Sequence, residues 1–456
     1  MLTTAGSVLA GKSSSSSGEP GATEKSRVMN ILITVGPAVY ILGLLLLLAW
    51  STQEALAMAG ISNHVMSVGK LSAALCLVVL VPAGIFLLFG WRVDINEFSM
   101  HSYYRNRLAR CYLGASNPKR DPDPLTGFDT GDVESLRLSS FLPSQGYTGP
   151  LPVFCASVNI SVGEDLAWQE RKAASFAFSP VLSGYHVPWT GGRYTGRLSY
   201  NGFVPTERFA YPDGGIHVST VAAISGAAIS PNWGYHTSPP MAFLLTMFNV
   251  RLGWWLPNPR RSYLAFDPKG LPPEKVDPFP RPKFAPKQLL RELLGQIGDD
   301  RDFVYLTDGG HFDNMGLYEL VRRRCYEIVI CDAEEDTGPV FEGIGMAIRK
   351  CRIDFGAEID LDLNQLATDA ATKVSKVHWI LGSIRYPETG KEKAGTILYI
   401  KSSITGKEAG DVYNYRLQHT PFPQDSTLDQ WFTESQFESY RRLGQQVVDQ
   451  CPYLAS

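Results

Sequence analysis

The chain has 456 residues, of which 44% are hydrophobic and 19% charged, with a formal net charge of −3 at pH 7. This length suits one large domain or two smaller ones with proper cores, and the near-neutral charge gives no reason to expect a nucleic acid as partner. The seven cysteines include no C-x-x-C pair, so they indicate neither a zinc site nor a disulfide framework and fit a reducing, cytoplasm-facing location.

The N-terminal fifth of the chain contains two long apolar runs. Residues 1–28 are rich in Ser, Gly and Ala, and we expect a disordered tail. The runs Ile31–Trp50 and Leu71–Trp91 then carry no charge over about 20 residues each, which is typical of membrane-spanning helices. The alternative is a pair of buried core helices. Basic residues flank the outer ends of the runs, so residues 29–92 are predicted to form a transmembrane hairpin with both ends in the cytoplasm.

Residues 93–145 are predicted to be a juxtamembrane linker. Tyr103, Tyr104 and the neighbouring arginines could lie at the level of the lipid headgroups, or they could cap a linker helix. Residues 146–456 are predicted to form the globular domain. Within it, Trp189–Gly196 superficially resembles a glycine-rich oxyanion loop, but the prolines and aromatic residues around it favour an ordinary loop.

Ser225 is the candidate nucleophile of the chain. An apolar run leads into this serine among small residues, which a strained strand-to-helix elbow requires. Its flanks are Ala223 and Ala227 instead of glycines, and Pro231 would end the helix that should follow the elbow. Two interpretations therefore stay open: Ser225 is the nucleophile, or its segment packs beneath the active site.

The segment after Ser225 contains an apolar helix and a basic, proline-rich stretch. Trp254, Trp255 and Leu256 end the apolar part and are expected to be buried, with a lipid-facing position as the alternative. Lys283 and Lys287 lie beside prolines and could contact an anionic membrane surface, or they are ordinary solvated charges.

Asp308 ends the apolar run Phe303–Asp308, and two glycines follow it. A helix and a second strand, Tyr326–Asp332, come next, so the pattern predicts one right-handed parallel crossover. Asp308 would then lie at the carboxyl end of a strand, where open α/β sheets place their ligands. The alternative is a simple Asp-Gly turn, and His311 is expected to have a packing or capping role.

The last part of the chain alternates between helix and strand patterns. A helix is predicted over Phe341–Cys351, strands over Val377–Ile384 and Thr396–Lys401, and one or two helices over Ser426–Val448. This alternation predicts an α/β fold with a mixed, largely parallel sheet flanked by helices. The acidic stretch that follows Asp332 is interpreted as a strand-end loop, because its spacing does not match a calcium site.

Several of these segments resemble a known family. The block Asp308-Gly-Gly-x-x-x-Asn314-x-x-Leu317 resembles the D-G-G/A block of patatin-like and cytosolic phospholipase A2-like lipid acyl hydrolases. Over roughly its last three quarters the chain is similar to the C-terminal portion of large bacterial membrane proteins with a patatin-like phospholipase domain. The further matching segments are Tyr104–Leu108, Leu166–Arg171, Ala223–Asn232 and Ser435–Tyr440.

The resemblance implies a patatin-like fold and a Ser–Asp dyad. Asp308 and Ser225 would be the catalytic residues, and Gly309, Gly310 and Asn314 would form the active-site loop, with no metal and no organic cofactor. The stretch around Ser225 resembles the family's small-residue block, which packs beneath the site, more than the family's G-x-S-x-G elbow. The chain contains no G-x-S-x-G sequence and lacks the S-G-G-G stretch of the family.

The expected function is therefore a membrane-anchored lipid acyl hydrolase that is incomplete on its own. Its substrate would be a membrane phospholipid or another acyl-ester lipid, its partners would include the bilayer and an upstream catalytic segment or chain, and its location would be a multi-pass membrane protein. The alternative is a non-catalytic membrane scaffold, or a subunit that complements an upstream chain bearing the nucleophile. We expect the chain alone to hydrolyse lipid esters poorly or not at all.

Overall fold

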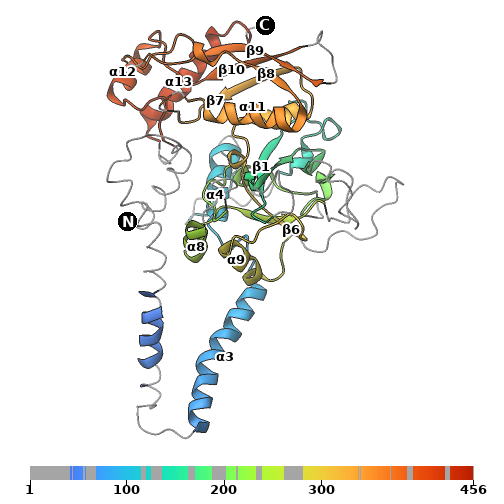
Figure 1. The fold of residues 1–456 in the computed structure, drawn as a ribbon, viewed down its shortest axis with the longest axis vertical. Coiled ribbons are helices and arrows are strands. Elements are labelled where there is room, and N and C mark those ends of the chain that lie inside the picture. Colours follow the sequence, from blue (N-terminus) through green and yellow to red (C-terminus); the bar gives the residue numbers. More distant parts are fainter. Residues whose placement is uncertain are drawn as a thin grey trace, which may run out of the picture. The chain divides into compact units, whose positions relative to one another are not determined.

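The computed structural model divides into two compact units, one within residues 18–312 and the other within residues 313–456 (Figure 1). The described residues are 42–43, 45–54, 57, 68–114, 120–124, 136–162, 170–186, 202–211, 214–232, 239–260, 281–336, 338, 340–369, 371–387, 394–426 and 432–454. The predicted tail 1–28 and the predicted oxyanion-like loop Trp189–Gly196 lie outside them.

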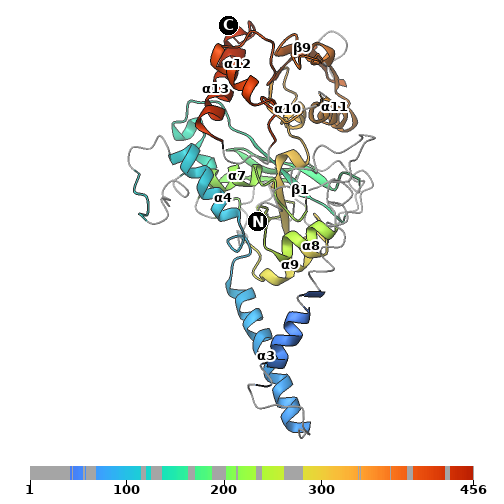
Figure 2. The ribbon, with the colours of Figure 1, turned by 90° about the vertical axis from the view of Figure 1, so that its left-hand side faces the viewer.

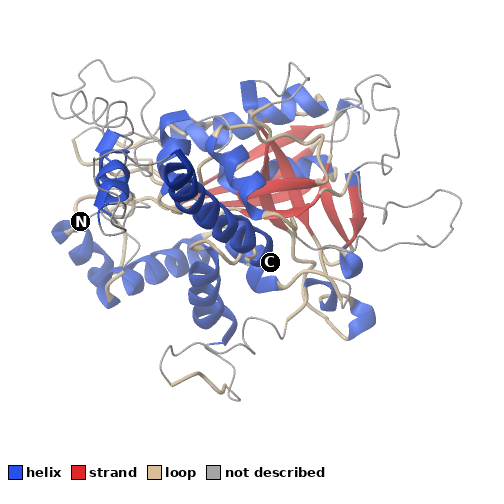
Figure 3. Ribbon diagram, turned by 90° about the horizontal axis from the view of Figure 1, so that it is seen from below, coloured by secondary structure: helices blue, strands red, loops and turns tan. Residues whose placement is uncertain are grey.

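The unit of residues 18–312 is built on a six-stranded sheet with the strand order β4-β3-β2-β1-β6-β5. Figure 3 draws the strands of the protein in red. Every strand pairing in this sheet is antiparallel. The strands are β1 (Phe154–Asn159), β2 (Ala173–Phe178), β3 (Leu182–Tyr185), β4 (Phe203–Pro205), β5 (Trp254–Pro257) and β6 (Phe303–Asp308). The helices are α3 (Val68–Arg92), α4 (His101–Leu108), α7 (Val218–Ser225), α8 (Pro239–Met247) and α9 (Ala285–Leu293), with short turns η1 (Ala109–Gly114), η2 (Leu138–Ser140), η3 (Pro143–Gln145), η5 (Thr206–Arg208) and η7 (Gly309–His311).

Helix α7 covers one part of this sheet, and its composition explains why. Six of its eight residues are buried, and apolar Val221 and Ile224 join the same core cluster as Val158 of β1 and Leu306 of β6. The helix packs against β1 and β6 on one side and against α4 on another (Figure 2). A short helix that is apolar nearly all round is stable only when other elements cover it, so α7 is held close to the central strands.

A buried ionic network supports the edge of the sheet at β5. The Arg251 guanidinium contacts the Glu292 carboxylate at 2.9 Å, with both side chains fully buried, and the Trp255 indole N–H donates to the same carboxylate at 2.7 Å. Trp254, Trp255 and Leu256 are 2% exposed or less. The alternative of a lipid-facing position for these three residues was therefore wrong, because they form the strand that closes the sheet.

The unit that follows residue 312 contains a four-stranded sheet with the order β7-β10-β9-β8. β7 and β10 are parallel, and the other two pairings are antiparallel. The strands are β7 (Glu327–Asp332), β8 (Glu358–Asp360), β9 (Trp379–Arg385) and β10 (Gly395–Lys401), and the helices are α10 (Leu317–Arg322), α11 (Glu342–Phe355), η8 (Leu363–Gln365), α12 (Gly410–Gln418) and α13 (Glu434–Gln450).

The prediction of one mixed, largely parallel sheet was wrong. The protein is α/β, but β6 and β7, which were expected to be the two strands of a parallel crossover, belong to different sheets. β6 pairs with β1 and β5 in antiparallel fashion. The physical reason is that β6 is buried along most of its length, so its side chains lack the alternation that marks an antiparallel strand exposed on one face.

The predicted membrane spans also need correction. Crossing the ~30 Å hydrocarbon core takes about 20 consecutive apolar residues in one helix. Within the part of the chain that the structure describes, no helix combines the length and apolar composition that a crossing requires. The predictions of two transmembrane helices and of a multi-pass location with a cytoplasmic domain were therefore wrong. The first run, Ile31–Trp50, lies largely outside the described residues, and the second falls in α3, which carries Lys70 in its first turn and Pro82 inside.

Candidate functional site

Asp308 lies where the sequence predicted it, at the last position of a buried strand. It ends β6 and is paired in register with Ala156 of β1. Its backbone N–H donates to the Ala227 carbonyl, just beyond α7, at 3.4 Å. Its carboxylate accepts a hydrogen bond from the Gly310 N–H at 2.6 Å and so caps the short turn η7. The strand and the turn therefore fix both the backbone and the side chain of this residue.

The surroundings of Asp308 make its carboxylate more basic than usual. Removal of water by burial raises the pKa of Asp308 from 3.8 to about 6, against the smaller opposing effect of the Gly310 N–H. Near neutral pH the group is ionised, yet it binds a proton far more readily than a solvated aspartate. A pKa close to the working pH is the property that a general base requires.

The two glycines after Asp308 allow the chain to turn closely against β1. A Cβ on Gly309 would lie 2.7 Å from the Cys155 carbonyl oxygen, which is a backbone atom that cannot move aside cheaply. The buried Ser157 hydroxyl also donates to the Gly309 carbonyl, at 3.3 Å. Gly309 is buried, whereas Gly310 is exposed and gives its N–H to Asp308. The predicted loop glycines thus shape the turn at the end of β6.

Ser225 contacts the same residue of β1, Cys155, as the turn after Asp308. It is the last residue of α7, half-buried, and its hydroxyl donates to the Cys155 carbonyl at 2.7 Å. The structure therefore brings Ser225 and the Asp308 turn to one carbonyl group. The hydroxyl proton, however, is directed to the backbone and not to the Asp308 carboxylate.

The local geometry of Ser225 differs from a nucleophile elbow. An elbow places the serine between a strand and the N-terminus of a helix, where the positive end of the helix dipole faces the site. Ser225 lies instead at the C-terminal end of α7, after an unbroken helix from Val218. The negative end of the dipole would oppose the charge that develops when a serine loses its proton.

The other predicted site residues lie elsewhere. Asn314 belongs to the unit that follows residue 312, where its side chain is hydrogen-bonded to Glu334. His311 is at 2.8 Å from the Thr307 hydroxyl through its Nδ1 atom, which agrees with the expected packing role. Asp332, which ends β7 and precedes the acidic loop, pairs with Lys401 at 2.9 Å. Among the described residues, no group of three His, Cys, Asp or Glu side chains is arranged to hold a metal ion.

Sequence reasoning missed Tyr104 as a neighbour of this centre. Tyr104 lies on α4, and a Cβ on Gly226 would be 2.5 Å from its hydroxyl oxygen. Burial, followed by the negative charge of Asp308, raises the pKa of Tyr104. The phenol therefore stays protonated and can donate a hydrogen bond near the carboxylate. The sequence contained no local signal for this position, because α4 and β6 are about 200 residues apart.

Comparisons with known proteins assign this chain to no family. No family model matches the chain, and no curated protein matches it. Among solved structures, human GIVD cytosolic phospholipase A2 is similar with a TM-score of 0.38 and 15% sequence identity, over 81% of this chain and 53% of that one. The chain thus spans about half the length of that structure. This is a coarse likeness to a phospholipase structure, and a likeness at this level assigns no role to any residue.

Proposed function

We propose that the unit of residues 18–312 carries the proton-accepting half of a lipid acyl-ester hydrolase centre, with Asp308 as the general base. The observation that supports this most strongly is the combination of position and basicity at Asp308. The residue ends a central strand, is held by the Gly310 N–H, and has a pKa raised to about 6 by burial. The substrate would be a membrane phospholipid or another acyl-ester lipid.

The reaction needs a serine hydroxyl beside this base. The serine oxygen attacks the ester carbonyl carbon, Asp308 takes the hydroxyl proton, and the tetrahedral oxyanion collapses as the leaving alcohol recovers that proton. Water then attacks the carbonyl carbon of the acyl-serine as Asp308 accepts a proton from it, the serine ester bond breaks, the fatty acid leaves, and the serine oxygen recovers that proton. Tyr104, a neutral donor in the same neighbourhood, would orient the Asp308 carboxylate or the entering ester.

Ser225 is the candidate nucleophile for this base. Its hydroxyl donates to the Cys155 carbonyl, against which the turn after Asp308 packs, so the serine would have to change its acceptor to use Asp308 as the base. This change would break a hydrogen bond of 2.7 Å to a backbone carbonyl. Ser225 also lacks the helix N-terminus that would stabilise an oxyanion. We therefore expect weak hydrolysis by this chain alone.

The second candidate function is a subunit or scaffold that acts with a nucleophile-bearing upstream segment or chain. The hydrogen bond from Ser225 to Cys155 favours it, because a supporting residue beneath a site would be bound in this way. In that case Asp308 would be the base for a serine that another segment supplies. A bilayer partner is proposed for both functions, since the ester substrates of either would reside there.

The two functions are separated by a fluorophosphonate probe together with hydrolysis of a water-soluble p-nitrophenyl ester. The full chain is compared with Ser225→Ala, Asp308→Asn and a matched control, Ser140→Ala, which alters an exposed serine hydrogen-bonded to the Arg137 carbonyl. If the chain is a weak hydrolase, the probe labels it at Ser225, the rate rises as pH increases through about 6, and the rate is lost in both site variants but kept in the control.

Three other outcomes would each decide a separate part of the proposal. Labelling that persists in Ser225→Ala would remove this serine as the nucleophile. No labelling at all, with hydrolysis appearing when an upstream segment is added and disappearing in Asp308→Asn, would establish the subunit function. Hydrolysis in the presence of that segment that is unchanged in Asp308→Asn would reject the role proposed for Asp308.

A further inference from the structure

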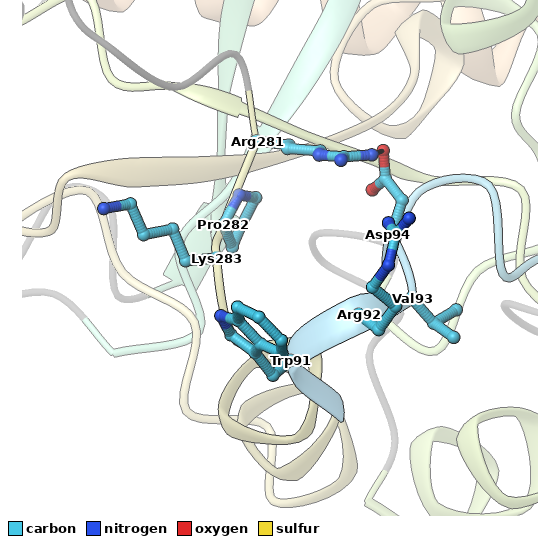
Figure 4. A pocket seen from close by; sticks show the side chains of 7 residues that line it. All are labelled: Trp91, Arg92, Val93, Asp94, Arg281, Pro282 and Lys283. Atoms are coloured by element: carbon cyan, nitrogen blue, oxygen red, sulfur yellow. Dashed lines mark hydrogen bonds and ion pairs between the residues drawn. The ribbon is translucent and has the colours of Figure 1, made fainter. Parts of the chain in front are cut away.

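A pocket opens where α3 meets the segment that leads into α9. Its volume is about 310 Å³, and its walls include Trp91, Arg92, Asp94, Arg281, Pro282 and Lys283 (Figure 4). All of these residues belong to the unit of residues 18–312. A cavity of this size can hold a phosphate group together with part of the molecule that bears it.

The pocket carries an excess of positive charge. Arg92, Arg281 and Lys283 are exposed cations in its walls, and Asp94 is the single carboxylate among the lining residues. Arg281 reaches across the opening and pairs with Asp94, whereas the Lys283 side chain is directed outward (Figure 4). Among the lining residues two arginines face one carboxylate, so the chemistry of the pocket suits an anion with several oxygen acceptors.

The two walls of the pocket are held at a fixed spacing. Gly90 is buried in the last turns of α3, and a Cβ at this position would lie 2.4 Å from Pro286 of α9. Pro282 is buried as well, although its neighbours Arg281 and Lys283 are exposed. The close contact between α3 and α9 therefore fixes the backbone of the two walls before any ligand arrives, which lowers the entropic cost of binding.

Exposed apolar side chains form an apolar border on α3 and on the helices packed next to its end. They lie at the end of α3, on and directly beside α9, which packs against α3, and at the end of α8, which packs against α9 (Figures 1 and 2). Their exposed fractions range from 37% to 67%, and they are Phe86, Leu87, Phe89, Trp91, Met247, Phe248, Phe284, Leu290 and Leu294. Apolar patches with basic residues beside them are typical of surfaces that contact lipid, and indole rings favour the headgroup level.

From these two features together we infer that the pocket binds the phosphate of an anionic phospholipid at a bilayer surface. Arg92 and Arg281 contact the phosphate oxygens, Trp91 lies beside the headgroup, and the apolar side chains of α3, α8 and α9 enter the boundary between headgroups and acyl chains. A free phosphate would use the cations but would leave the apolar border in water. The lipid therefore accounts for both features, and this inference does not depend on the hydrolase proposal.

The test is flotation of the full chain with vesicles of phosphatidylcholine, with and without phosphatidylglycerol. Each cation near an anionic surface contributes roughly fivefold to affinity, so Arg92→Gln/Arg281→Gln should weaken binding to the phosphatidylglycerol vesicles by about 10–30-fold. The matched control is Arg352→Gln/Arg441→Gln, which removes the same charge from two exposed ion pairs elsewhere and should bind as the wild type does. Trp91→Ala should weaken binding to a smaller extent.

Three further arms separate the alternatives. Binding should be kept in Asp308→Asn, so failure of the hydrolase proposal would leave this result intact. Inorganic phosphate added at millimolar levels should displace little protein. The double variant also breaks the pair between Arg281 and Asp94. The single variant Arg92→Glu keeps that pair, so it guards against misfolding, and it should weaken binding at least as much as Arg92→Gln.

The inference would be overturned by equal flotation with both kinds of vesicle, by a double variant that binds like the control, or by complete release with inorganic phosphate, which would identify a free anion as the ligand.

Discussion

Asp308 and Asp332 both end a strand, yet their surroundings give them opposite chemistry. Asp332 at the end of β7 is 5% exposed and accepts from the Lys401 ammonium at 2.9 Å, from the Tyr399 hydroxyl, and from the Glu334 N–H at 2.8 Å. Asp308 at the end of β6 accepts from the Gly310 N–H, and burial raises its pKa to about 6. An aspartate that is neutralised by a lysine is structural, whereas one that is desolvated without a cation can accept a proton.

Strand pairing accounts for the difference. β7 and β10 are parallel, and their register places Lys401 directly opposite Asp332 at the carboxyl ends of the two strands. β6 and β1 are antiparallel, and their register places Ala156 opposite Asp308. The same residue type at the same point of a strand therefore receives a cation in one unit and a methyl group in the other.

The largest expected effect is the loss of the cation from the Asp332 cluster. Lys401→Met leaves a buried carboxylate without its counter-charge, so we expect the free energy of unfolding to fall by about 3–5 kcal/mol. Urea denaturation at neutral pH measures this. The control Arg441→Met breaks the exposed pair with Glu438 and should change nothing measurable. A loss no larger than that of the control would mean that the buried pair does not stabilise the unit.

The second prediction concerns the turn after Asp308. Gly309→Ala introduces a Cβ at 2.7 Å from the Cys155 carbonyl oxygen, and we expect a loss of about 1–3 kcal/mol because backbone must shift to relieve the contact. The control is Gly444→Ala in α13, where no described atom outside the surrounding helix backbone lies within 4 Å of the added Cβ and where alanine should stabilise the helix by about 0.5–1 kcal/mol. Equal effects of the two substitutions would contradict the tight turn.

The smallest expected effect tests the basicity of Asp308 through stability. The folded-state pKa of about 6 is above the ordinary 3.8, so the folded protein binds this proton more tightly and its stability falls as pH rises from about 4 to 6. Asp308→Asn removes that loss. The free energy of unfolding of Asp308→Asn should be equal to or lower than that of the wild type near pH 4, and higher by about 1–2 kcal/mol near pH 8. This difference is smaller than the full pKa shift would give, because Asp308 is partly exposed to solvent.

Urea denaturation of both proteins across this pH range measures the difference, and every other titrating group cancels between them. A difference that stays constant with pH would show that Asp308 has an ordinary pKa. A difference of the opposite sign would show that a cation stabilises its charged form, as Lys401 does for Asp332.

The sequence by itself determined the elements near the site and several beyond it. It placed β6 at Phe303–Asp308 with Asp308 at its end, as observed. It also predicted helix α11 and strands β9 and β10 to within a few residues at each end. These elements depend on hydrophobic periodicity and on turn residues, which act within a few positions of the chain.

Only the tertiary structure decided what these elements meet. An apolar strand has the same pattern in a parallel and in an antiparallel sheet, so the sequence did not show that β6 pairs with β1 and β5. The partner of Ser225 is a carbonyl 70 residues earlier, and Asn314 lies in a different unit from Asp308. Hydrogen-bond partners, desolvation and pKa depend on atoms brought together from distant parts of the chain, and no local pattern records them.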